Sequence, residues 1–343
     1  MLDPSKILIA TQCTPIEPWK SEVLRLFKSL NLFGGNLAQA KKVACFSESI
    51  DENFKNELEE LGVKIIFIKS LDSRYAYANK IQMLQIKEEY DVLITLDTDI
   101  IVTGDFSNYI DKNTISTKIV DTDPLGLENW GKLFEFFKLD TPSDRFQTCI
   151  TNDTTIPWFN SGVLFIPKKF SSQLYDSWIK YNKKILENYY TLNFMSKNSS
   201  THDHKFAFTD QYALALAIHE IKLPYRLLPL DLNFSTHHHI HESFQPEKIS
   251  PLLVHYHHLV SKNGNLFHCK YEKTNALINN INSKLNLPNL DYELLVDDIY
   301  LELLGRHADN IGLSHYSSLL NDKKITISNI KENIKNSNEF KTK

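Results

Sequence analysis

Two carboxylates follow a segment of the chain that has the character of a buried strand. Residues 92–96 form an apolar run, which predicts a strand buried on both faces of a parallel sheet. Asp97 and Asp99 come directly after this run. Ligands of open α/β sheets bind outside the carboxyl ends of strands, and two carboxylates there suit a hard divalent cation with positions left open for phosphate oxygens. The pattern therefore predicts a metal and diphosphate site.

A second Asp-x-Asp lacks this context. Asp121 and Asp123 are followed by Pro124 and Gly126, with no apolar run leading into them. We interpret this copy as a loop whose acids form turns.

Two further polar clusters can recognise a sugar. Residues 158–163 (Trp-Phe-Asn-Ser-Gly-Val) predict a turn that brings the backbone close to a ligand and directs Asn160 toward it. Asn and Ser both donate and accept hydrogen bonds, as sugar hydroxyls require. Asp210 and Gln211 open a predicted helix, where Asp210 can bind sugar hydroxyls and Gln211 can lie near the anomeric carbon. The alternatives are an ordinary turn and a helix cap.

Histidines supply the third kind of chemistry. His255, His257 and His258 lie at the end of a predicted strand, where an imidazole can complete the coordination sphere begun by the aspartates. The run at 237–241 can bind adventitious metal or can consist of plain loop residues.

No glycine-rich phosphate loop follows the first strand, because Gly34 and Gly35 come after a predicted helix and indicate its end. A bound diphosphate then needs a metal ion and basic side chains, for which Lys80, Arg74 and Lys262 are the candidates.

The elements that must position these residues alternate along the first half of the chain. This β-α-β-α order predicts a parallel sheet with helices on both faces. The predicted strands are 7–11, 43–46, 63–68, 92–96, 163–166, 227–234 and 251–256, and the predicted helices are 18–30, 52–61, 77–89, 172–187 and 209–220. Residues 103–157 are expected to be irregular, as in a long active-site loop.

The last part of the chain has a different character. Short amphipathic helices are expected at 292–304, 310–320 and 327–336. We therefore predict an α/β domain at 1–270, a helical linker at 271–290 and a small all-helical domain at 291–343.

Composition limits the partners and the compartment. The net charge of −4 over 343 residues gives no indication of nucleic acid or of an anionic membrane surface as a partner. The four cysteines have neither metal-ligand spacing nor a disulfide pattern, which favours a reducing compartment. We see neither a signal segment nor an apolar stretch long enough to span a membrane, so a cytoplasmic location is expected.

Taken in order, the four clusters over about residues 5–270 resemble the family-8 type of nucleotide-sugar glycosyltransferase, which has the GT-A fold. The family's Asp-x-Asp is matched by 97–99, its Phe-Asn-Ser/Ala-Gly by 159–162, its Asp-Gln by 210–211 and its late histidine best by His255. The chain departs from the family after that histidine, where Gly and Lys-Pro-Trp are missing. His257 therefore stays a rival ligand, and Lys262 is the candidate for the family's phosphate-binding lysine.

The resemblance implies transfer of a hexose from a UDP-sugar to an acceptor hydroxyl, with retention. The metal, Mn²⁺ or Mg²⁺, would be held by Asp97, Asp99 and His255. Gln211, Asp210 and Asn160 would be catalytic, with Gln211 either a nucleophile or an electrostatic support. The donor-binding residues would be Thr11, Lys80, Asp97, Thr98, Asp99, Ser161, Gly162 and Lys262. The acceptor can be a glycan, a lipid-linked glycan or a protein.

The tail from 291 resembles a small helical domain of undefined function that is appended to bacterial glycosyltransferases and to secreted proteins. It is expected to dock the acceptor or to mediate self-association. Two rivals to the transferase remain. A sugar-phosphate nucleotidyltransferase requires a Gly-rich, Arg-containing loop after the first strand, where 11–16 has none. A non-catalytic nucleotide-sugar-binding or scaffold protein would act through the tail.

Overall fold

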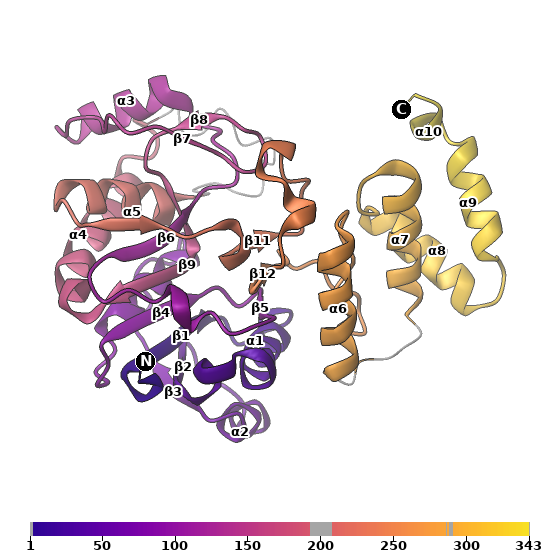
Figure 1. Cartoon of the computed structure of the whole chain (residues 1–343), viewed down its shortest axis with the longest axis horizontal. Helices are drawn as coiled ribbons and strands as arrows, with labels where there is room; N and C mark the ends of the chain where they lie inside the picture. The colour runs from indigo at the N-terminus through magenta and orange to yellow at the C-terminus, as the bar shows by residue number, and fades with distance from the viewer. Residues whose placement is uncertain (1–2, 193–207, 286, 288–290, 343) are drawn as a thin grey trace.

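The predicted strand at 92–96 lies in the middle of a seven-stranded sheet (Figure 1). The computed structural model describes residues 3–192, 208–285, 287 and 291–342. The strand order is β10 (Tyr225–Leu227), β6 (Ile115–Ile119), β9 (Phe159–Pro167), β4 (Val92–Leu96), β1 (Ile7–Cys13), β2 (Lys41–Phe46) and β3 (Val63–Phe67). All neighbours pair in parallel except β9, which is antiparallel to both β4 and β6.

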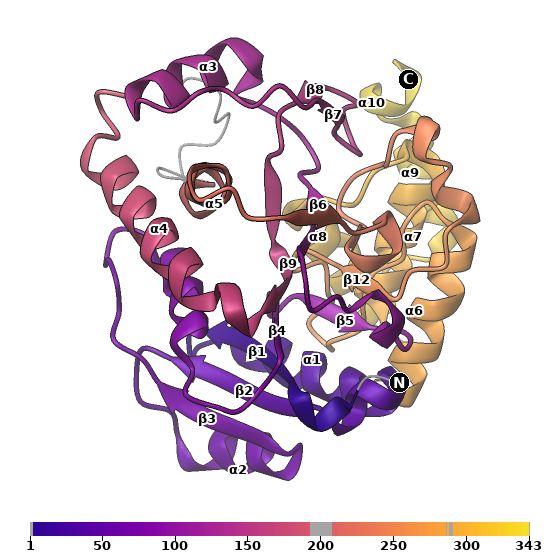
Figure 2. The same cartoon turned by 60° about the vertical axis from the view of Figure 1, so that its left-hand side comes forward.

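Helices cover both faces of this sheet, as the sequence predicts. On β1, Leu8 and Ala10 belong to one core and Ile7 and Ile9 to the other, because successive side chains of a strand point to opposite faces. The first core is closed by η3 (Ala76–Gln85), α3 (Gly126–Phe136), α4 (Lys168–Glu187) and α5 (Thr209–Glu220); the second by α1 (Trp19–Phe33) and α2 (Glu52–Glu60). Figure 2 shows α4 and α5 on the side of the sheet away from α1.

A small second sheet joins distant parts of the chain. It pairs β12 (Leu253–His255) in parallel with β11 (Phe234–Ser235) and antiparallel with β5 (Ile100–Val102). Because β5 starts directly after Asp99 and His255 is paired with Ile100, this sheet brings the late histidines to the carboxylates.

Three predictions about the elements are wrong. Residues 103–157 are not irregular throughout, since they contain β6 of the main sheet and α3. The segment 227–234 is no single strand, because a 3-10 turn at Leu230–Leu232 separates β10 from β11. The helix expected at 77–89 is the 3-10 helix η3, which ends at Gln85.

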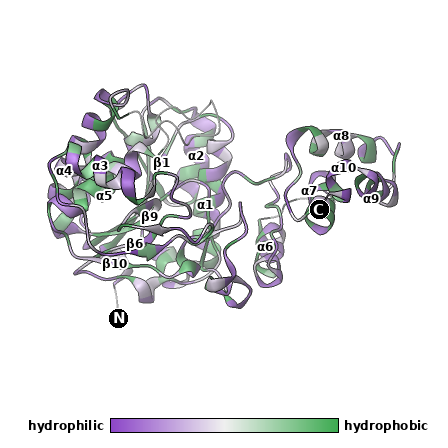
Figure 3. Ribbon diagram, turned by 90° about the horizontal axis from the view of Figure 1, so that it is seen from above, coloured by the Kyte–Doolittle hydropathy of each residue, from purple (hydrophilic) through white to green (hydrophobic). Residues whose placement is uncertain are grey.

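The C-terminal helices have a core of their own. After α6 (Glu272–Lys284) come α7 (Tyr292–Leu304), α8 (Asn310–Asn321), α9 (Ile327–Asn336) and α10 (Asn338–Lys341), and α7 to α10 bury the apolar residues Val296, Ile299, Leu320 and Ile330. Figure 3 shows them beside the larger domain, with α6 between the two. Residues 286 and 288–290 of the expected linker lie outside the described residues.

The caps of α7, α8 and α9 follow from the sequence. Asp291, Asp309 and Thr326 each accept a hydrogen bond from a main-chain N–H of the first turn. Within the described residues, no helix is long and apolar enough to cross a membrane.

Candidate functional site

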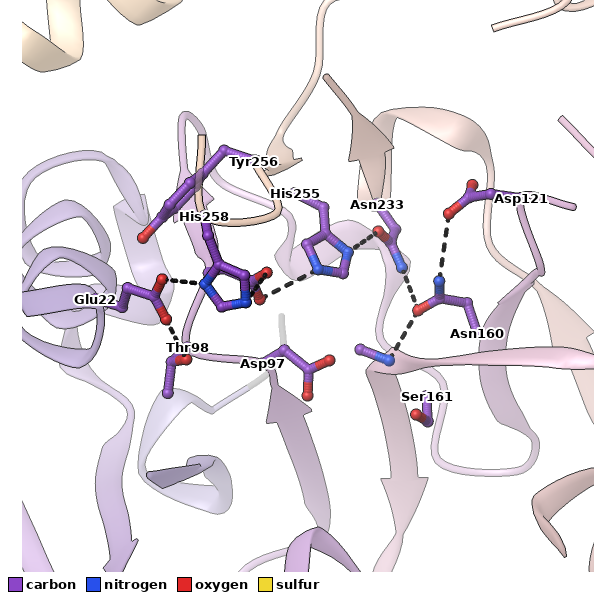
Figure 4. Close-up of polar contacts among 12 residues, drawn as sticks. Glu22, Asp97, Thr98, Asp121, Asn160, Ser161, Asn233, His255, Tyr256 and His258 are labelled. Atoms are coloured by element: carbon purple, nitrogen blue, oxygen red, sulfur yellow. Dashed lines mark hydrogen bonds and ion pairs between the residues drawn. The ribbon is translucent and has the colours of Figure 1, made fainter. Parts of the chain in front are cut away.

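Asp97 and Asp99 lie in the tight turn that joins β4 to β5 (Figure 4). The Asp97 N–H donates to the Gly162 carbonyl at 2.9 Å, which continues the pairing of β4 with β9. The Ile100 N–H donates back to the Asp97 carbonyl at 3.3 Å and closes the turn. Main-chain hydrogen bonds thus hold both carboxylates at the carboxyl end of β4.

His255 meets Asp99 from the small sheet. Its Nε2 lies 3.2 Å from Asp99 Oδ1, and its Nδ1 lies 3.0 Å from Asn233 Oδ1. The Asn233 amide in turn donates to Asn160 Oδ1 at 3.0 Å. A partner on the second ring nitrogen, which fixes the imidazole, is the usual support of a histidine that binds a metal.

His257 joins the same group. Ligand atoms of Asp99, His255 and His257 all lie within 4.8 Å of one another, and the rings of the two histidines stack with centroids 3.7 Å apart. The sequence leaves His255 and His257 as rivals, whereas the structure brings both to Asp99.

Gly162 separates Asp97 from His255. A Cβ atom at this position would lie 3.0 Å from Asp97 Oδ2, from His255 Cε1 and from Asn160 Oδ1. Any larger residue would therefore fill the space between the carboxylate and the imidazole.

The proposed sugar-binding residues form a second cluster beside Asp97. Lys80 on η3 places its Nζ 2.6 Å from Asp97 Oδ1, 3.2 Å from Ser161 Oγ and 3.8 Å from Asp210 Oδ2. Ser161 Oγ donates to Asp210 Oδ2, and Tyr75 OH donates to Asp210 Oδ1, each at 2.5 Å. Four of the predicted positions are thus one connected network.

The family model described as the Rhodobacterales glycosyltransferase domain matches residues 22–222, which is more than half of the chain. The chain belongs to this glycosyltransferase family. A second model, a domain of unknown function (DUF4214), matches residues 279–343. No curated protein matches the sequence.

The chain is similar to several solved glycosyltransferases at low sequence identity. An active-site variant of LgtC is 11% identical, with a TM-score of 0.50, and the match covers 83% of this chain and 97% of LgtC. Mouse xyloside xylosyltransferase 1 is 16% identical over 73% of this chain and 97% of its own, with a TM-score of 0.45. GlyE of Streptococcus pneumoniae is 17% identical over 81% of this chain and 63% of its own, with a TM-score of 0.46. The likeness to LgtC supports the GT-A fold.

The charged side chains at this site shift one another's pKa values. Burial raises the pKa of Asp97, and the neighbouring Asp99 acts in the same direction against Lys80. Burial alone would raise the pKa of Asp99, but His255 lowers it overall. Burial alone would lower the pKa of Lys80, which Asp97 instead raises. The two carboxylates repel each other, and Lys80 and His255 oppose this repulsion.

Other predicted residues of the glycosyltransferase lie apart from these contacts. Thr98 Oγ1 donates to Glu22 at 2.7 Å. Thr11 is buried in β1, and its hydroxyl has no partner among the described residues. Gln211 is partly exposed beside Asp210. Lys262 is 77% exposed, and its Nζ lies 3.2 Å from Glu293 of α7.

Asp121 is interpreted from the sequence as a turn-forming acid, but it lies beside Asn160. Its Oδ1 accepts hydrogen bonds from Lys118 and from Cys149 Sγ, and its Oδ2 lies 3.5 Å from Asn160 Nδ2. Burial would raise the pKa of Asp121, but Lys118 and His257 lower it to about 2. Its position just beyond β6 was the available signal. Asp123, in contrast, accepts from Trp130 and from two main-chain N–H groups, as a turn-forming acid does.

Glu22 was not predicted, and His258 was predicted only as a candidate ligand beside His255 and His257. Glu22 is fully buried on α1 and accepts from His258 Nδ1 at 2.5 Å, while His258 Nε2 lies 3.9 Å from Asp99 Oδ2. The hydrogen bond to Glu22 raises the pKa of His258 to about 9. No periodicity marks Glu22, because it is a charged residue on the buried face of a helix.

Proposed function

We propose that the protein transfers a hexose from a UDP-sugar to an acceptor hydroxyl in a metal-dependent reaction that retains the anomeric configuration. The observation that carries this proposal is the convergence of Asp99, His255 and His257, with Asp97 facing His255 across Gly162. The donor and the stereochemistry follow from the resemblance to family-8 enzymes.

The donor set fits a divalent cation. Asp99, His255 and His257 lie within reach of one another, and Asp97 faces His255 across Gly162. This mixed oxygen and nitrogen set suits Mn²⁺ better than the oxygen-preferring Mg²⁺. We propose Asp97, Asp99 and His255 as ligands, with His257 as a further one. When bound, the ion supplies Lewis-acid stabilisation of the charge on the diphosphate leaving group.

The chain's own residues would orient the sugar. Lys80 is tied to Asp97 and Ser161, so its ammonium can also meet a phosphate oxygen or a sugar hydroxyl. Asp210, Asn160 and Gln211 are proposed to act on the sugar, with Gln211 near the anomeric carbon as a nucleophile or an electrostatic support.

Three further residues are proposed to bind the donor. We propose that Thr11 and Thr98 line the donor site from β1 and from the turn after β4. Lys262 would contact phosphate after leaving Glu293.

The acceptor is proposed to be a glycan, a lipid-linked glycan or a protein, with no role for nucleic acid. The four buried free cysteines support a cytoplasmic location. We divide the chain into a transferase domain at 1–270, a helical linker at 271–290 and a helical domain at 291–343, which also offers a surface for self-association.

The test is UDP release from a panel of UDP-sugars, with Mn²⁺ or with a chelator, for wild type, Asp99→Asn and the exposed control Glu128→Gln. We expect release with one donor only, dependent on Mn²⁺, lost in Asp99→Asn and kept in the control. Mn²⁺-dependent UDP binding without release, for every acceptor and for water, would instead favour a non-catalytic binding protein. Absence of both would exclude the proposal.

A further inference from the structure

The proposed metal ligands His255 and His257 belong to a segment with little regular structure. We call residues 255–268 the histidine loop. Its first residue, His255, is the last residue of β12, and the loop contains an isolated bridge between Val260 and Leu266. His257 and His258 have φ angles of 46° and 63°, in the left-handed region. Such conformations persist only where surrounding contacts hold them.

The transferase domain holds the beginning of this loop. The Tyr256 N–H donates to the Asp99 carbonyl at 3.1 Å, and Tyr256 OH accepts from Arg25 at 2.8 Å. His258 is held by Glu22. These contacts reach residue 258 and leave the second half of the loop to other partners.

Residues 261 and 265 of the loop are bonded to a carboxylate of the helical domain, whereas Leu266 is bonded to Asn282 of α6. Asp291 is 2% exposed, and its Oδ1 caps α7 by accepting the N–H groups of Glu293 and Leu294. Its Oδ2 accepts from Ser261 Oγ and, at 2.8 Å, from Asn265 Nδ2. One side chain thus both starts α7 and anchors the loop.

Main-chain bonds make residues 261–265 a closed turn on this anchor. The Ser261 N–H donates to the Asn265 carbonyl, and the Gly264 N–H donates to the Ser261 carbonyl, each at 2.9 Å. Glu293 Oε2 accepts the Lys262 N–H at 2.8 Å. Three contacts of this segment thus come from the N-cap and the first turn of α7. The position of this helix therefore determines the position of residues 261–265.

A second series of polar contacts connects the helical domain to His255 itself. His307, which follows α7, lies with Nε2 3.4 Å from the Thr236 carbonyl, and Thr236 donates its N–H to the His255 carbonyl at 3.2 Å. Fully buried Asp297 accepts from His307 Nδ1 and from the Ala308 N–H, both at 2.8 Å. A buried carboxylate is costly unless it is fully hydrogen-bonded, so Asp297 fixes His307 against the strand.

We propose that the C-terminal helical domain positions the histidine half of the metal site, with Asp291 as the principal positioning residue. This inference rests on the proposed function, because it concerns the same metal site. It gives the domain of unknown function a role within the chain, because α7 supports the loop after the late histidine.

The test compares full-length Asp291→Asn with full-length Asp309→Asn. Asn keeps an N-cap oxygen at both positions, but at 291 it replaces the acceptor of Ser261 and Asn265 with a donor. Asp309 caps α8 in the same domain by accepting from the Gly312 N–H, which makes it a matched control.

We expect the dissociation constant for Mn²⁺ alone, measured by calorimetry, to rise by about 10-fold in Asp291→Asn, the range for a residue that supports a metal ligand. Hydrogen exchange of residues 256–268 in the metal-free protein should become faster, while exchange of β1, β4 and β9 stays as in wild type. Asp309→Asn should change neither quantity.

Unchanged Mn²⁺ affinity and unchanged loop exchange in Asp291→Asn would overturn the inference and leave the proposed function standing. Faster exchange throughout the chain, with equal loss of affinity in both variants, would overturn it too, because the effect would be general destabilisation. A wild type that binds no Mn²⁺ would overturn the metal site and this inference together.

Discussion

The two halves of the candidate metal site are held by different means. Asp97 and Asp99 lie in a turn between paired strands, and main-chain hydrogen bonds to β9 fix it. The histidine loop leaves its paired strand after His255, and beyond that residue single side chains, chiefly Glu22 and Asp291, anchor it to other elements together with the main-chain bond from Tyr256 to Asp99. We therefore expect the carboxylate half to keep its geometry when a neighbouring side chain is changed, and the histidine half to lose it.

The largest expected effect tests charge balance in the carboxylate half. Lys80→Met removes the 2.6 Å ion pair with Asp97 and the bond to Ser161, and it leaves Asp97 and Asp210 without their shared cation. Removing one partner of a buried pair costs about 3–5 kcal/mol. Denaturant unfolding should record a loss near the lower end of this range, because Asp97 is partly exposed.

The matched control is Lys132→Met, which breaks an exposed i,i+4 pair with Glu128 and should cost less than about 1 kcal/mol. Mn²⁺ should restore the stability of Lys80→Met more than it raises that of wild type, because the ion replaces the lost cation. Equal losses in the two variants would mean that Lys80 is not a structural counter-ion.

The second prediction separates geometry from stability. Gly162→Ala places a methyl group 3.0 Å from Asp97 Oδ2 and from His255 Cε1, so these two groups can no longer approach a shared ion. We expect Mn²⁺ affinity to fall by about 10–100-fold, with overpacking of about 1–3 kcal/mol. Gly131→Ala on α3 meets no atom within 4 Å and should leave calorimetric Mn²⁺ binding unchanged. Retained Mn²⁺ affinity in Gly162→Ala would contradict a site shared by Asp97 and His255.

The same contrast explains what the sequence could predict. The apolar run at 92–96, the Asp-x-Asp and the helix at 209–220 are local signals. Strand pairing then determines where Asp97 lies, and the start of α5 determines where Asp210 lies. The GT-A fold was predictable because its strands and helices alternate with clear periods. Residues 115–119 were missed because Ser, Thr and Lys interrupt the apolar pattern of a strand that is nevertheless buried.

The histidine half could not be predicted in the same way. Glu22 and His258 are 236 residues apart in the chain, and Asp291 and Ser261 meet only once two domains have packed. A buried carboxylate on an amphipathic helix has no period and no motif, so only the tertiary structure reveals it. The sequence could not choose between His255 and His257 for the same reason.

The third prediction concerns Glu22, which touches both halves. Glu22 accepts from Thr98 in the turn and from His258 in the loop. Glu22→Gln keeps one acceptor and loses the charge that pairs with His258, at a cost of about 1–3 kcal/mol. Hydrogen exchange should become faster in 256–268 but not in 97–102, whereas Glu17→Gln, at the exposed start of α1, should change neither segment. Equal acceleration of both segments would remove the distinction between the halves.

The smallest effect is a pH dependence at the contact between the domains. His307 lies between Asp297 and the Thr236 carbonyl, and His268 lies between Asp298 and Asn279 Oδ1, so the doubly protonated imidazolium can donate to both neighbours in each case. Burial alone would lower the pKa of His307, but Asp297 raises it; the hydrogen bond to Asp298 raises the pKa of His268.

Both pKa values are raised above the unfolded value of about 6.5, so these histidines stabilise the folded protein fully below that pH. The stabilisation is lost as the pH rises through each folded-state pKa. We expect wild type to lose its advantage in melting temperature over a His268→Gln, His307→Gln double variant as the pH rises above about 6.5. A difference that is constant with pH would mean that neutral imidazoles suffice, and that the histidine loop owes its position to the carboxylates of α7 alone.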